Sequence, residues 1–168
     1  MPIELFIHNV AFGFATILVA GLSVAVFVAG VHRRQAILLA LASICVTGFT
    51  LSHLIGVNID EPAVSRQVLM FNLFNIFTAV FTYHWITALL QRVRQDRYLL
   101  AAVYGAGTLI FTAAVRFPEL FLTGVRPKMY LPNYYEPGPL YAVMVAFNVS
   151  VMVYLVYRLL IAYQRATE

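Results

Sequence analysis

The sequence predicts an all-α membrane protein with five transmembrane helices, and its composition and its patterning both support this fold class. Of its 168 residues, 62% are hydrophobic and 11% are charged, whereas a soluble domain has roughly 45–50% apolar and about 25% charged residues. The apolar residues form continuous runs, unlike the alternating segments of about ten residues that build β-barrels. This composition excludes a soluble enzyme, a disordered chain and a nucleic-acid-binding protein.

Five apolar runs are long enough to cross a bilayer. About 20 residues are needed, because about 30 Å of hydrocarbon is crossed at about 1.5 Å per residue. None of the five runs contains Lys, Arg, Asp or Glu, and together they make residues 1–168 a single transmembrane domain. The predicted helices are Leu5–Val31, Ala36–Ile55, Val68–Leu90, Tyr98–Val115 and Pro139–Tyr157. We expect the fifth helix to continue beyond the membrane through Arg158 to Arg165.

The basic residues predict the orientation of these helices. Seven of the eleven Lys and Arg residues lie in the segments that follow the first, third and fifth helices. The positive-inside rule places those segments in the cytoplasm, so the N-terminus is expected outside and the C-terminus inside a bacterial inner membrane. The connections at 32–35 and 91–97 are short. Helices 1 and 2, and helices 3 and 4, should therefore be antiparallel neighbours.

The outer side carries two longer connections. We expect the first to run from Gly56 to Gln67. The second, at 116–138, contains four prolines and several aromatic residues. Prolines stiffen a chain, and Tyr and Phe favour the headgroup region. We therefore expect an ordered outer loop between helices 4 and 5, with a short interfacial helix that begins at Pro118.

Polar residues inside the spans are the candidates for a binding site. Asn72 and Asn75 are three residues apart and share one helix face. Together with His84 and the turn Pro137-Gly138-Pro139, they could form a ligand pocket that opens to the outer side. The alternative, which we favour, is that these polar groups form hydrogen bonds between helices.

Two histidines are candidates for cofactor binding. His8 and His53 lie at similar depths near the outer ends of their helices, so they could hold a haem or a pigment if those helices face each other. His84 lies roughly 20 Å deeper than His53 by helical rise, which excludes a shared iron. The alternative is a structural role for each histidine, and no cofactor and no metal site are predicted.

Small residues at four-residue spacing mark two helix faces that allow close backbone approach. On the first helix they are Gly21, Ala25 and Ala29, and on the fourth they are Ala102 and Ala106. Such faces pack either inside the bundle or against another subunit, and the sequence leaves both possibilities open.

Three segments carry a resemblance to a known family. They are Phe117-Pro118-Glu119-Leu120-Phe121-Leu122-Thr123-Gly124-Val125, Tyr134-Tyr135-Glu136-Pro137-Gly138-Pro139-Leu140-Tyr141 and Phe81-Thr82-Tyr83-His84-Trp85. They resemble the N-terminal multi-helix (7TM-like) membrane sensor region of bacterial histidine kinases and diguanylate cyclases. The resemblance implies a sensory or scaffolding bundle and supplies no catalytic residue. In that family the last helix leads into cytoplasmic signalling domains. This sequence contains no such output domain. Either it is part of a longer chain, or it is a stand-alone relative, which we would expect to signal through a separate partner.

Two functions remain as hypotheses, and neither is enzymatic. In the first, the chain is a membrane sensor or receptor-like module that relays an outer-leaflet or periplasmic signal to a cytoplasmic signalling protein. In the second, it is an accessory subunit of a larger bioenergetic or photosynthetic complex. It would then pack against other membrane subunits and contact pigment, quinone or lipid. No carboxylate lies inside any predicted span, which disfavours a proton pump or an ion-coupled carrier.

Overall fold

The computed structural model describes residues 2–29 and 33–167, and this part of the chain is mostly helical. His32, in the basic connection after the first predicted helix, lies outside the described residues. The elements are α1 (Ile3–Val28), α2 (Arg33–Gly56), α3 (Pro62–Leu69), the 3-10 helix η1 (Met70–Phe74), α4 (Asn75–Leu89), α5 (Arg97–Arg116), α6 (Pro118–Phe121), β1 (Leu122–Lys128), β2 (Leu131–Pro137) and α7 (Pro139–Thr167).

Within the described residues, five helical runs are long and apolar enough to span a membrane, as predicted. They are α1, α2, the continuous run α3–η1–α4, α5 and α7. α7 extends well beyond Tyr157 to Thr167, which confirms the expected continuation of the last helix. These lengths and compositions are those of a multi-pass membrane protein.

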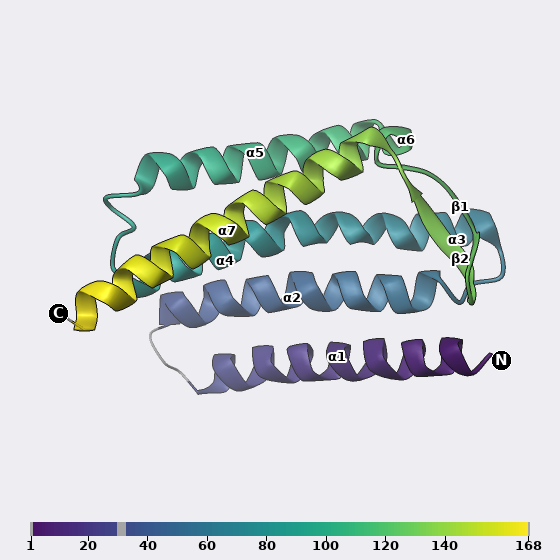
Figure 1. Cartoon of the computed structure of the whole chain (residues 1–168), viewed down its shortest axis with the longest axis horizontal. Coiled ribbons are helices and arrows are strands. Elements are labelled where there is room, and N and C mark those ends of the chain that lie inside the picture. Colours follow the sequence, from purple (N-terminus) through teal and green to yellow (C-terminus); the bar gives the residue numbers. More distant parts are fainter. Residues whose placement is uncertain (1, 30–32, 168) are drawn as a thin grey trace.

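The long helices lie side by side, with α1 at one edge, α2 and α4 in the middle, and α5 with α7 at the other edge (Figure 1). The expected neighbours α1 and α2, and likewise α4 and α5, are in contact. One end of this row carries the start of α1 and the two strands, and we name it the hairpin end. The other end carries the α4–α5 connection and the C-terminus, and we name it the turn end.

The third span begins earlier than the sequence predicted. Its helix starts at Pro62 instead of Val68, so the connection from α2 covers only residues 57–61. Proline is well suited to the first position of a helix, where its missing N–H is not needed. The polar residues that suggested a loop have partners: the Ser65 hydroxyl donates to the Gly56 carbonyl at 2.7 Å, and Arg66 donates to the Leu122 carbonyl at 2.8 Å.

The outer loop is ordered by a β-hairpin that the sequence did not predict. The short helix expected at Pro118 is present as α6. It is followed by the antiparallel strands β1 and β2, with Val125 opposite Tyr135. The two strands each contain an internal proline and their register is irregular, so the alternation that signals a strand is broken. The side-chain amide of Asn133 donates to the Ile59 carbonyl and fastens β2 to the α2–α3 connection.

The core lies between the middle helices and α7, and α1 contributes little to it. Near the hairpin end, Leu69, Ile76, Phe121 and Leu122 are fully buried. A second cluster of α4, α5 and α7 residues, which includes Tyr83, lies closer to the turn end. Only 6% of the most apolar part of α1 is buried, against 44% for α2. The apolar surface of α1 is therefore left for lipid or for another protein.

A close backbone contact joins α6, the hairpin and α7. The Gly138 N–H donates to the Phe121 carbonyl at 2.8 Å. A Cβ atom at Gly138 would lie 2.3 Å from the carbonyl oxygen of Leu120. Only glycine allows this approach, so Gly138 fixes where the hairpin meets α7.

We expect Gly138→Ala to lower the free energy of unfolding by about 1–3 kcal/mol, because the added methyl group forces α6 and α7 apart. The measurement is unfolding in mixed detergent micelles followed by circular dichroism. Gly21→Ala is the matched control, since no atom lies within 4 Å of a Cβ placed there. Equal stability of the two variants would show that the contact does not constrain the fold.

Candidate functional site

A cavity of about 380 Å³ lies at the hairpin end between the helices and the hairpin. This volume falls within the range of small-molecule sites, which are largely apolar with a few polar groups. We name it the outer pocket, after the loop at 116–138 that the sequence predicts to lie on the outer side. Its helix wall comes from α1 and α2, and its hairpin wall comes from the turn between the strands and from β2. It is lined by His8, Phe12, Phe49, His53, Lys128, Met129, Tyr130, Leu131, Tyr134 and Tyr135.

Helix periodicity and two polar contacts build the helix wall. His8 and Phe12 are four residues apart on α1, and Phe49 and His53 are four residues apart on α2, so each pair shares a face. A reciprocal amide pair at 3.0 and 2.9 Å joins Asn9 of α1 to Asn58, which lies in the connection just after α2. The hydroxyls of Thr16 and Thr50 are also hydrogen-bonded, at 2.9 Å. The four rings are thereby brought to one place.

The two histidines lie next to each other in this wall. Their ring centroids are 5.4 Å apart, and each ring is 4.6 Å from the ring of Phe12. Their helices therefore face each other here, which is the condition under which the sequence predicts that the two histidines are close. Nε2 of His8 and Nδ1 of His53 are buried and have no hydrogen-bond partner among the described residues. Leaving such a group unpaired costs about 1–3 kcal/mol, and a ligand that reached either nitrogen would recover this cost.

Tyrosines dominate the hairpin wall. The rings of Tyr134 and Tyr135 are stacked at 4.4 Å, and the Tyr141 hydroxyl donates to the Tyr135 hydroxyl at 2.9 Å. The Lys128 ammonium lies 5.0 Å from the centre of the Tyr134 ring, where the ring face attracts a cation. Burial raises the pKa of Tyr134 and of Tyr135 to about 12. Both phenols are therefore neutral donors at physiological pH.

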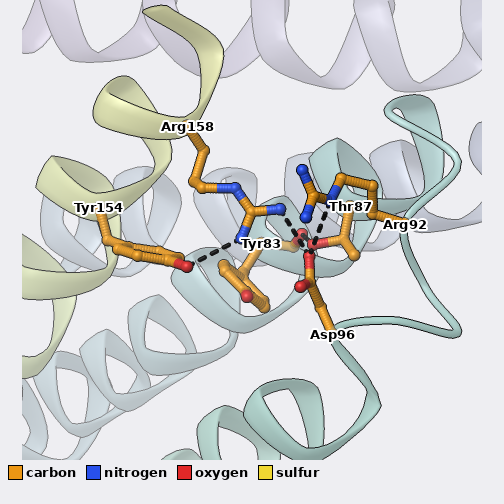
Figure 2. A network of polar contacts seen from close by, with 6 residues as sticks. All are labelled: Tyr83, Thr87, Arg92, Asp96, Tyr154 and Arg158. Atoms are coloured by element: carbon orange, nitrogen blue, oxygen red, sulfur yellow. Dashed lines mark hydrogen bonds and ion pairs between the residues drawn. The ribbon is translucent and has the colours of Figure 1, made fainter. Parts of the chain in front are cut away.

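A second polar cluster lies at the turn end (Figure 2). The Arg158 guanidinium of α7 lies 2.7 Å from the Asp96 carboxylate and donates to the Tyr154 hydroxyl at 2.8 Å. Arg92 lies 4.0 Å from the same carboxylate oxygen. The side chains of Asp96 and Arg158 are only 13% and 14% exposed. We name the Asp96–Arg158 pair the latch, because it holds α7 to the connection between α4 and α5.

Local structure favours this position for the carboxylate. Asp96 is the residue that immediately precedes α5, where the positive end of the helix dipole stabilises an anion. Its side chain makes no capping bond to the helix and instead meets Arg158. Tyr83, beside the latch in Figure 2, is buried, and its hydroxyl has no hydrogen-bond partner among the described residues.

The residues of the sequence-predicted pocket are distributed over the bundle. The Ser52 hydroxyl donates to the Asn72 side chain at 2.8 Å, and the Asn75 carbonyl accepts a bond from Asn148 at 3.5 Å. His84 is hydrogen-bonded to the Tyr104 hydroxyl at 2.9 Å. Twelve residues separate Asn72 from His84, on the order of 18 Å along a helix, so these two side chains do not share a cavity.

The remaining predicted residues have other places. Pro137, Gly138 and Pro139 form the junction between β2 and α7. The small-residue face of α1, formed by Gly21, Ala25 and Ala29, is exposed. On α5, Ala102 is exposed and Ala106 is half-buried. Close packing on α5 comes instead from Gly107, where a Cβ atom would lie 2.8 Å from Val80.

Sequence reasoning missed the latch and the hairpin wall. A charge signal for the latch exists, because Asp96 is the only acidic residue in the basic connection 91–97 and Arg158 is the first charged residue after the last apolar run. The hairpin wall could not be found without the strand pairing. Among the described residues, no three His, Cys, Asp or Glu side chains cluster as a metal site would require.

Comparison with known proteins adds nothing to this geometry, since no family model, no curated protein and no solved structure matches the chain.

We expect Asp96→Ala to lower the free energy of unfolding by about 1.5–3 kcal/mol, because Arg158 loses a charged hydrogen-bond partner in a largely buried place. Glu136→Ala is the control. It removes the pair with Arg126, whose side chains are 36% and 71% exposed, and should cost about 1 kcal/mol or less. Both values come from unfolding in mixed micelles. A similar small cost for both variants would argue against the latch.

The tyrosines of the hairpin wall make a separate pH prediction. Their pKa of about 12 in the folded chain exceeds the ordinary value of 10, so the unfolded chain releases these protons first. The stability they contribute is complete below pH 10 and is lost as the pH rises from 10 through 12. Absorbance titration of phenolate in the folded protein should show a late component that Tyr134→Phe and Tyr135→Phe each reduce. A late component that both variants leave intact would contradict the assignment.

Proposed function

We propose that this chain is a non-enzymatic membrane sensor module, in which the state of the outer pocket is relayed along α7 to a cytoplasmic signalling protein. One observation carries the proposal. β2 lines the outer pocket with Tyr134 and Tyr135 and continues through Gly138 directly into α7. Only Gly138 separates the strand that lines the pocket from a helix long enough to span the membrane, so a displacement of the strand would reach α7 directly. The distribution of basic residues supports an orientation with the pocket outside the bacterial inner membrane.

The length of α7 supports a relay. Its 29 residues span about 43 Å, compared with about 30 Å of hydrocarbon. The helix therefore extends beyond the membrane at the turn end, where a partner can read its position. The Tyr135–Tyr141 hydrogen bond adds a side-chain link between the hairpin wall and the start of α7.

A relay needs two arrangements of α7 whose equilibrium a ligand can shift, and formation or loss of the latch would distinguish them. α7 has one arrangement with Arg158 on Asp96, and breaking this pair releases its last turns from the α4–α5 connection. A ligand shifts such an equilibrium only by its difference in affinity for the two arrangements. A ligand that contacts the hairpin wall binds the two arrangements with different affinities if the wall moves with α7.

A specific observation also favours the second hypothesis, an accessory subunit of a larger bioenergetic or photosynthetic complex. α1 contacts mainly α2 and leaves large apolar side chains exposed, among them Phe14, Ile17 and Phe27. Its exposed face contains Gly21, Ala25 and Ala29, which would allow a helix of another subunit to approach closely. In this role the polar residues at the two ends would stabilise the fold and contact neighbouring subunits.

The relay can be tested by the distance between two spin labels. The only cysteine, Cys45, is replaced by Ala, and labels are attached at Arg94→Cys, in the α4–α5 connection, and at Arg165→Cys, near the end of α7. Asp96→Ala marks the released arrangement. Phe49→Trp partly fills the outer pocket, and we expect it to change the distance distribution between the two labels relative to that of the unaltered pocket.

Val153→Trp is the matched control, because this residue is on an exposed side of α7 away from the pocket. It should leave the distance unchanged. A distance that responds to Asp96→Ala but not to Phe49→Trp would contradict the relay and leave the accessory subunit as the better proposal. Mild-detergent extraction from native membranes should then yield a fixed set of larger subunits.

A further inference from the structure

We propose that the outer pocket binds a flat conjugated ring that carries carbonyl or hydroxyl oxygens, the chemistry of a quinone or quinol head group. The inference deepens the proposed function, because it names the ligand class of the same pocket. It rests on the side chains that line the two walls and on the two histidine nitrogens that lack a partner. It does not depend on whether α7 moves.

The aromatic side chains of the two walls favour a ligand with a flat ring. Phe12 and Phe49 face the cavity from the helices, and Tyr130, Tyr134 and Tyr135 face it from the hairpin. Aromatic side chains bind other conjugated rings by offset stacking and by edge-to-face contact. A saturated acyl chain would gain only burial of apolar surface from such walls and would not make use of their geometry.

The two histidines favour oxygen atoms on that ring, because these can form hydrogen bonds with imidazole nitrogens. His53 is 5% exposed, and its Nδ1 has no partner among the described residues, as is also true of Nε2 of His8. A neutral imidazole donates from one nitrogen and accepts at the other. A carbonyl oxygen has two lone pairs and can accept from both rings, whereas a hydroxyl can donate to either. Oxidised and reduced forms of one head group can therefore both be held.

The hairpin wall provides a second polar point. Lys128 lines the pocket from the hairpin, and its ammonium lies 5.0 Å from the centre of the Tyr134 ring. An ammonium in this wall can donate to an oxygen of a bound ring. No Asp or Glu lines the pocket among the described residues, and Glu136 is paired with Arg126 at 2.7 Å. The pocket therefore offers donors to ligand oxygens and, among the described residues, no carboxylate to a cationic ligand.

Two other ligands suit the pocket less well. A metal held by two histidines needs a partner for the other nitrogen of each ring, and no such hydrogen bond occurs among the described residues. A haem bound by both histidines would have its porphyrin plane between them, where the Phe12 ring contacts both imidazoles. The ligand therefore belongs beside the pair, in the cavity.

A larger groove between α1 and α2 offers no comparable polar groups to a ligand. About 550 Å³ lies between α1 and α2, away from the hairpin, and its lining is almost entirely apolar. Its two hydroxyls, on Ser23 and Thr47, donate to carbonyls of their own helices at 2.9 and 2.8 Å. This groove suits a lipid chain, whereas the outer pocket combines walls of aromatic rings with two histidines that each have an unpaired nitrogen.

The test is binding of defined probes to the full chain in lipid nanodiscs, measured by calorimetry. The probes are a methylated naphthoquinone without a tail, the same head group with an alkyl tail, and a saturated cyclohexane with that tail. We expect both quinones to bind and the saturated probe to bind at least about fivefold more weakly, since it lacks the hydrogen bonds and the stacking. Tighter binding of the tailed quinone would identify a membrane quinone, and equal binding would identify a soluble aromatic compound.

Variants then separate the histidines from general burial. His8→Phe and His53→Phe keep an aromatic ring in the wall and remove the nitrogens, and each should weaken quinone binding at least about fivefold. His84→Phe removes a histidine that lies outside the pocket and should leave binding unchanged. Thermal unfolding of each variant confirms that the fold is kept.

Three results would overturn the inference: the saturated probe binds as tightly as the quinones, the two pocket variants bind quinone as the unaltered chain does, or Zn²⁺ binds stoichiometrically and quinone does not. The relay has its own readout. Quinone binding without movement of the α7 label would retain this inference and reject the relay. A label that responds to Phe49→Trp in a chain that binds no quinone would do the reverse.

Discussion

The close contact between Gly138 and α6 is the constraint on which the rest of the hairpin end depends. Its N–H donates to the Phe121 carbonyl, and the Leu120 carbonyl occupies the space of a side chain. This contact closes the outer loop on itself, so that the hairpin leaves α6 and enters α7 in one fixed direction. The tyrosines of β2 then line the outer pocket together with His8 and His53. The bonds of Asn133 to Ile59 and of Arg66 to Leu122 hold the same hairpin against the helices.

The parts of the fold that depend on local sequence were predictable, and the parts that depend on distant pairing were not. Apolar length and the absence of charge identify the five spans, and Pro118 identifies α6. The start of α3 at Pro62 was missed because its polar residues find partners that only the folded chain provides. The same limit applies to Asp96 and Arg158, which meet because α7 crosses the α4–α5 connection. His8 and His53 could be paired because they lie at similar depths, but the hairpin that faces them could not be predicted.

A chain surrounded by lipid must satisfy most of its polar groups internally. Ser52 with Asn72, Thr16 with Thr50, and His84 with Tyr104 are hydrogen-bonded between elements of the bundle. The latch does the same with charges. Buried atoms without a partner remain elsewhere among the described residues as well, including Nδ2 of Asn72 and Nε2 of His84. The outer pocket differs because its two unpaired nitrogens belong to neighbouring histidines that line one cavity.

The two walls of the outer pocket come from opposite ends of the sequence, and this has a consequence for biosynthesis. The helix wall is complete once residue 53 has been made, whereas the hairpin wall requires residues 128–135. α1 and α2 are consecutive and can pair early, but closure of the pocket is a long-range event that comes late. A nascent chain therefore has no site, and a ligand binds only the completed protein. Such a ligand shifts the balance towards the assembled state, so its supply during synthesis would determine how much of the chain matures.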